Sequence, residues 1–109
     1  MTEKKVSIVV NGTFEIAPAD QPRFFAIVTE HLGDTRREVR GCIYYNLAID
    51  VENPTLLHLI EGWESQEALD AHLASASLKE IRARFSVIPI KDYRMMIYSV
   101  GVQTPYAAY

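Results

Sequence analysis

The chain has 109 residues, 49% of them hydrophobic, which predicts one globular domain over residues 1–109 with residues 101–109 as a C-terminal tail. A net charge of −3 with scattered Lys and Arg argues against nucleic acid or an anionic membrane surface as a partner. No run approaches the roughly 20 apolar residues that span a bilayer. The lone cysteine, Cys42, excludes an internal disulfide, and residues 1–5 contain no long apolar signal core, so we expect a cytoplasmic protein.

The first half of the chain predicts a strand, a helix and a second strand. Residues 6–16 are rich in β-branched side chains and form the strand, in which Asn11 and Gly12 favour a local bulge or a site approached by a ligand. Pro18 ends it, and Asp20 can cap a helix from about residue 21 to residue 35 or beyond. The apolar stripe of that helix consists of Phe24, Ile27, Val28, His31 and Leu32. Residues 42–51 then form an almost continuously apolar strand.

The second half predicts a hairpin partner, two helices and a last strand. Residues 52–54 form the turn into a strand over residues 55–63. Ser65 is the expected N-cap of a helix whose packing face carries Leu69, His72, Leu73 and Ala76, so that Trp63 and His72 converge. Residues 74–77 form a break, and a short helix containing Leu78, Ile81, Arg82 and Phe85 ends before Pro89. Residues 91–102 form the last strand, followed by an uncharged tail that we expect to pack on another surface.

This order of elements predicts an α+β fold of the ferredoxin-like type, a four-stranded antiparallel sheet with helices on one face. The second and fourth strands are apolar at odd and even positions alike, whereas a sheet with one wet face would alternate. Something must therefore cover the second face. A second copy of the chain is the economical answer, so we predict a homodimer that pairs sheet to sheet as a dimeric α/β barrel.

The motif E-x-W-E-S-x-x-A-L-x-x-H-L, from Glu61 to Leu73, resembles the antibiotic biosynthesis monooxygenase domain family of small dimeric α+β barrels. Asn11 on the first strand and Gly41 before the second also match this family. This chain departs from the family pattern after the motif, because many members have a Pro-His pair where it has Ala76 and Ser77.

The haem-degrading branch of the superfamily differs further from this chain. It has a tryptophan where His72 stands, and its iron-ligating histidine falls at about Arg82. The resemblance therefore disfavours haem, and we expect no cofactor. No spacing of Cys, His, Asp and Glu suggests a metal, and no glycine-rich turn suggests a nucleotide.

The resemblance implies a cofactor-independent monooxygenase that oxidises a small aromatic, quinol or polyketide-type substrate with O₂. Such an enzyme needs a base, donors for a developing oxyanion and a dry pocket. Asn11, Trp63 and His72 are the candidate catalytic residues. Arg82, Tyr44 and Tyr45 are candidates for binding the substrate, although alternation places only one of the two tyrosines on each sheet face.

Each candidate also has a structural interpretation. Asn11 can satisfy a bulge, Trp63 can fill the core, His72 can bridge helix to strand or pair with Glu61, and Arg82 can extend into water. The alternative function is a small-ligand binding or isomerase module of the same fold without oxygenase activity. A third reading is a structural dimer whose pocket has filled in.

Overall fold

A computed structural model describes residues 5–107 of the chain and shows four strands, three α-helices and one short 3₁₀ helix in that range. In chain order they are β1 (Ile8–Glu15), η1 (Pro18–Asp20), α1 (Gln21–Glu38), β2 (Cys42–Ile49), β3 (Leu56–Trp63), α2 (Gln66–Leu73), α3 (Ala76–Phe85) and β4 (Lys91–Ser99). The predicted order of strands and helices is confirmed. All four strands are shorter than expected, β3 by one residue.

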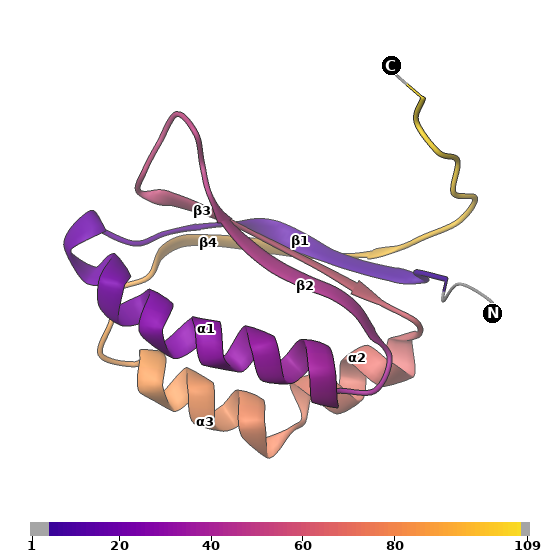
Figure 1. Cartoon of the computed structure of the whole chain (residues 1–109), viewed down its shortest axis with the longest axis horizontal. Helices are drawn as coiled ribbons and strands as arrows, with labels where there is room; N and C mark the ends of the chain where they lie inside the picture. Colours follow the sequence, from indigo (N-terminus) through magenta and orange to yellow (C-terminus); the bar gives the residue numbers. More distant parts are fainter. Residues whose placement is uncertain (1–4, 108–109) are drawn as a thin grey trace.

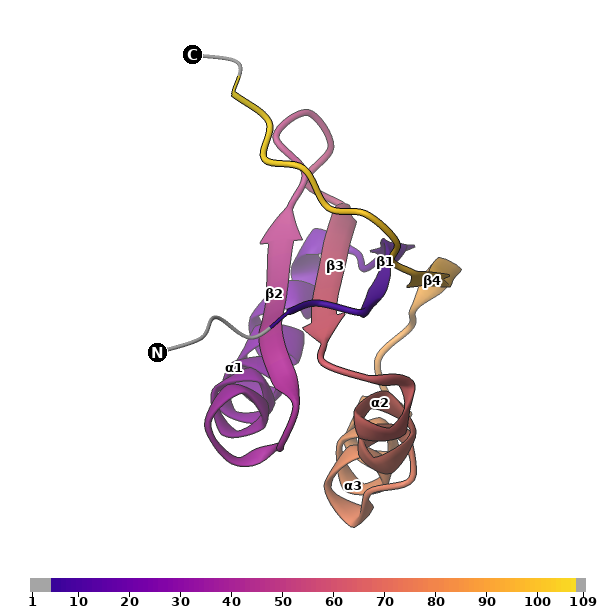
Figure 2. The same ribbon diagram turned by 90° about the vertical axis from the view of Figure 1, so that its right-hand side faces the viewer.

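The strands form one antiparallel sheet in the order β2-β3-β1-β4, and the three α-helices all lie on one of its faces (Figure 1). Viewed from the end, α1 lies beneath β2, while α2 and α3 lie beneath the other side of the sheet (Figure 2). The fold is therefore the predicted ferredoxin-like α+β architecture. Within residues 5–107, no helix has both the length and the apolar character needed to cross a bilayer.

The hydrophobic core lies between this sheet and the helices. It includes Ile8, Val10 and Phe14 of β1, Leu57 and Trp63 of β3, Phe24, Val28 and Leu32 of α1, Leu69 of α2 and Ile81 of α3. The whole predicted stripe of α1 is buried, His31 included. The 3.6-residue period of that helix thus directs one face onto the sheet.

The N-terminal ends of the helices follow the predictions only in part. Ser65 caps α2 as predicted, because its hydroxyl oxygen accepts the backbone N–H of Ala68 at 3.1 Å. Asp20, in contrast, makes no side-chain cap to α1. The break after α2 is also shorter than residues 74–77, since Ser75 caps α3 and Ala76 already belongs to that helix.

Strand β1 runs through Asn11 and Gly12 without a bulge, because both residues pair in register with β3 and β4. The irregularity comes later, between Thr13 and Glu15, where the register with β4 shifts. Gly12 is needed for another reason: a Cβ at this position would overlap the carbonyl oxygen of Arg94 in β4. The prediction of a bulge at Asn11 and Gly12 was wrong, and the glycine instead permits close approach of two strands.

Within residues 5–107, nothing covers the sheet face opposite the helices. Ile60, Met96 and Tyr98 lie on this outer face with 41%, 59% and 48% of their surfaces exposed. The tail also runs on this side of the sheet, away from the helices (Figures 1 and 2). Residues 101–107 are exposed, with one hydrogen bond from Gln103 Nε2 to the Val6 carbonyl, and residues 108–109 lie outside the described range.

Candidate functional site

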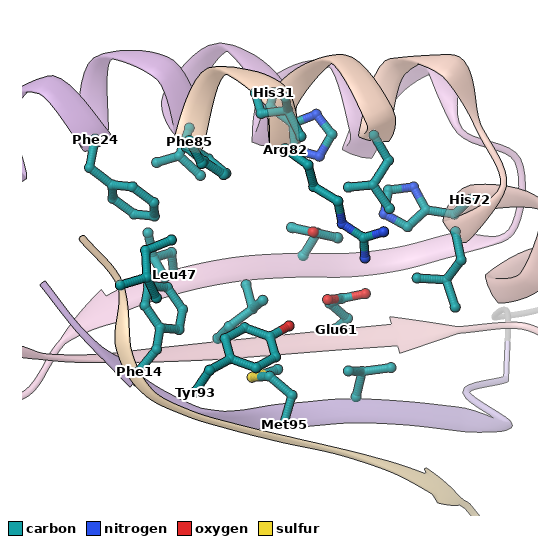
Figure 3. A pocket seen from close by; sticks show the side chains of 18 of the residues that line it. Phe14, Phe24, His31, Leu47, Glu61, His72, Arg82, Phe85, Tyr93 and Met95 are labelled. Atoms are coloured by element: carbon teal, nitrogen blue, oxygen red, sulfur yellow. The ribbon is translucent and has the colours of Figure 1, made fainter. Parts of the chain in front are cut away.

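A cavity of about 590 Å³ lies between the sheet and the helices, within the size range of small-ligand sites. Its walls are mostly apolar and aromatic, including Phe14, Phe24 and Phe85 (Figure 3). Polar side chains reach the same space from different elements. They include Tyr45 of β2, Glu61 of β3, His31 of α1, His72 of α2, Arg82 of α3 and Tyr93 of β4.

Glu61 projects into the cavity from β3, next to the middle of the sheet (Figure 3). It follows Leu57 and Leu59 at every second position, so strand alternation turns it toward the helices. Only 6% of its surface is exposed, and Oε1 accepts a 3.0 Å hydrogen bond from Nε1 of Trp63. Burial raises the pKa of Glu61 to about 7, although the Trp63 hydrogen bond acts in the opposite direction.

Trp63 is fully buried behind the cavity and does not line it. Its indole ring lies 4.9 Å from the ring of His72, measured between centroids, and its N–H is directed to Glu61. Trp63 therefore joins two polar groups of the cavity without facing the space itself. This arrangement confirms the predicted convergence of Trp63 and His72.

His72 reaches the cavity from α2, the helix that Ser65 caps. Burial, followed by the charges of His31 and Arg82, lowers the pKa of His72 to about 4, so the imidazole is neutral at pH 7. In residues 5–107 its buried Nδ1 has no hydrogen-bond partner. A buried polar atom without a partner is costly, so a polar atom of a ligand at this position would be stabilised.

Arg82 supplies the positive charge of the cavity. Its side chain remains accessible to solvent, and its guanidinium points from α3 toward Glu61 (Figure 3). Tyr45 lies beside Glu61 in the sheet, and burial raises the pKa of its phenol far above the ordinary value. The cavity thus offers a carboxyl group, a neutral imidazole, a neutral phenol and a guanidinium.

Four of the six candidate residues come together at this site, and two do not. His72, Arg82 and Tyr45 line the cavity, and Trp63 lies directly behind it. Asn11 and Tyr44 face the other side of the sheet. The physical reason is strand alternation, because Val10 and Tyr45 point toward the helices and their neighbours in sequence therefore point away.

The locations of Asn11 and Tyr44 reflect the packing of the outer face. Asn11 lies between Ile60 of β3 and Met96 of β4 in the sheet register. The ring of Tyr44 covers Gly62 so closely that a Cβ there would overlap it. The expectation that Asn11 shares a pocket with His72 is not met in the single chain.

Sequence reasoning missed the central role of Glu61, which it considered only as a possible partner of His72. The alternation of Leu57, Leu59, Glu61 and Trp63 was the signal that could have placed it on the buried face. His31 was also missed as a cavity residue. No group of three or more His, Cys, Asp and Glu side chains in residues 5–107 is arranged to hold a metal ion.

The model of the family described as "Antibiotic biosynthesis monooxygenase" matches residues 7–84, well over half of the chain. The chain therefore belongs to the antibiotic biosynthesis monooxygenase family. A comparison with curated proteins finds no match.

Solved structures show the same fold. A Deinococcus radiodurans protein, provisionally described as an antibiotic biosynthesis monooxygenase, is 19% identical, with a TM-score of 0.84 over 93% of this chain and 99% of that protein. A conserved protein from Methanosarcina mazei Go1 is 28% identical, with a TM-score of 0.76 over 86% and 92% of the two chains. Rv0793 from Mycobacterium tuberculosis is 22% identical, with a TM-score of 0.75 over 90% and 98%.

Proposed function

We propose that this protein is a cofactor-independent monooxygenase that oxidises a small hydroxylated aromatic with O₂ in the cavity between the sheet and the helices. The observation that carries the proposal is the buried Nδ1 of His72, which has no partner in residues 5–107 and adjoins an aromatic-walled cavity. A ligand oxygen at this place would satisfy that nitrogen. Membership of the family supports the reaction class.

The lining of the cavity favours an aromatic substrate with an oxygen that becomes anionic. Phe14, Phe24 and Phe85 offer flat apolar walls, and the guanidinium of Arg82 can pair with a phenolate or enolate oxygen. The rest of the wall is mostly apolar, which suits the ring of such a substrate.

The reaction itself requires only substrate and O₂. Deprotonation of an anthrone-type substrate gives an anion that can donate an electron to O₂, and the carbon–oxygen bond forms when the two radicals combine. The methylene carbon then loses its remaining hydrogen and becomes a carbonyl carbon. One oxygen atom stays in that carbonyl group and the other leaves as water, so atoms and electrons balance.

Dissolved-oxygen uptake with anthrone and a panel of hydroquinones tests the proposal, with autoxidation subtracted. We expect uptake by the wild-type protein and a loss of about tenfold or more in Arg82→Gln, because an anion-stabilising charge is removed. Arg84→Gln on the same helix is the matched control, since Arg84 lies outside the cavity. Binding of these aromatics without any uptake would instead favour the ligand-binding or isomerase alternative.

We also propose that the working unit is a homodimer in the cytoplasm. The exposed apolar side chains of the outer sheet face support a second copy as its cover. The lone cysteine is compatible with a reducing compartment.

A further inference from the structure

We infer that Glu61 is the proton acceptor of the cavity: its carboxylate takes the proton whose loss converts the bound aromatic into the anion that reacts with O₂. The inference rests on the proposed function for its substrate class. It assigns this role to a residue that was not among the candidate catalytic residues Asn11, Trp63 and His72.

The geometry of Glu61 suits a base. Its backbone lies in β3, which is hydrogen-bonded on both sides by β2 and β1, so the side chain projects from a rigid support. The Trp63 N–H holds Oε1 at 3.0 Å and fixes the orientation of the carboxyl group. Within the described residues no donor is bonded to Oε2, which leaves this oxygen to accept a proton from a ligand.

The other polar groups of the cavity are poorer proton acceptors. His72 has a pKa lowered to about 4, so its neutral ring binds a proton only weakly at pH 7. The phenol of Tyr45 stays protonated, and the guanidinium of Arg82 has donors but no acceptor. Glu61, with a pKa of about 7, is the group whose basicity matches the task near neutral pH.

The charged and titratable groups facing Glu61 come from β2, β4 and the three helices, whereas β1 places the apolar Val10 beside it. They are Cys42 and Tyr45 of β2, His31 of α1, His72 of α2, Arg82 of α3 and Tyr93 of β4. The pKa values of both histidines are lowered. Those of the Cys42 thiol and of the two phenols, Tyr45 and Tyr93, are raised. All five are neutral at pH 7, so the ionisation of Glu61 dominates the proton chemistry there.

The step is a simple proton transfer. A C–H bond of the substrate breaks, an O–H bond forms on Glu61 Oε2, and the electron pair moves onto the substrate oxygen that faces Arg82. Nothing is oxidised or reduced until O₂ arrives. Without O₂ the proton can return from solvent, so the same step appears as hydrogen exchange.

Anaerobic exchange of the anthrone methylene hydrogens with D₂O, followed by mass spectrometry, isolates this step. We expect the wild-type protein to accelerate exchange and Glu61→Gln to lose the acceleration by about 100-fold or more, because glutamine cannot accept the proton. Glu67→Gln, which removes an exposed carboxylate of α2, should exchange like wild type. Circular dichroism and the fluorescence of Trp63, the sole tryptophan, check that the variants are folded.

Wild-type-like exchange in Glu61→Gln would overturn the assignment, and so would the absence of accelerated exchange in the wild-type protein. If Glu61→Gln does not fold, Glu61→Asp keeps the charge but withdraws the carboxylate, and slower exchange is then expected. Exchange without oxygen uptake would leave the base in place and reject the oxygenase. Oxygen uptake that is insensitive to Glu61→Gln would keep the oxygenase and reject Glu61 as its base.

Discussion

At the scale of single residues, the buried Glu61 carboxyl group couples folding to pH. Its pKa is raised from 4.5 to about 7, so the folded state holds the proton more tightly than the unfolded chain does. The stabilisation from this proton is fully present below pH 4.5 and is lost as the pH rises through about 7. At about 1.4 kcal/mol per pKa unit, the loss amounts to about 3 kcal/mol.

Glu61→Gln should remove this dependence, because its amide does not ionise. We expect the free energy of unfolding of the variant, relative to wild type, to rise by up to about 3 kcal/mol between pH 4.5 and pH 8. Urea unfolding at a series of pH values measures this difference. Glu67→Gln, at an exposed position, should follow the wild-type curve, and parallel curves for Glu61→Gln and wild type would contradict the coupling.

Trp63 is expected to set the basicity of Glu61. In the native protein the hydrogen bond from the indole N–H lowers the pKa of Glu61. Trp63→Phe removes this N–H, so the pKa of Glu61 should rise above its native value of about 7. The midpoint of the pH dependence of anthrone exchange should then move to higher pH. Leu57→Val, which removes core volume without touching the indole, should leave the midpoint unchanged, and equal midpoints in all three proteins would exclude the positioning role.

At the scale of elements, the pairing of β1 with β4 depends on Gly12. A Cβ at Gly12 would overlap backbone atoms of Arg94 and Met95, which cannot move as a flexible side chain can. We expect Gly12→Ala to destabilise the protein by about 1–3 kcal/mol and to lower the thermal midpoint. Gly101→Ala is the matched control, since nothing lies within 4 Å of its added Cβ. Equal midpoints for the two variants would show that β4 adjusts freely.

At the scale of the whole molecule, the uncovered outer face predicts self-association. Sedimentation should give about twice the chain mass of 12.4 kDa at micromolar concentration. Met96→Lys places a charge on this face, at the edge strand β4, and should shift the protein toward the monomer. Val87→Lys alters an exposed apolar residue off the sheet and should sediment as wild type does. A monomeric wild-type protein would contradict the proposed homodimer.

Local patterns in the sequence determined the elements and much of the fold. The apolar period of α1, the Ser65 cap and the order of strands and helices were readable because each depends on residues close together in the chain. The motif from Glu61 to Leu73 was enough to indicate the family. The positions of Trp63 and His72 followed from the same short segment.

Only the tertiary structure decided which candidates share a cavity. A strand has two faces, and its sequence does not say which one the helices cover when both carry apolar residues, as on β1 and β2. This choice placed Tyr45 inside and left Asn11 and Tyr44 outside. The basicity of Glu61 was likewise decided by burial beneath helices from distant parts of the chain, because a carboxyl pKa depends on its solvation rather than on its neighbours in sequence.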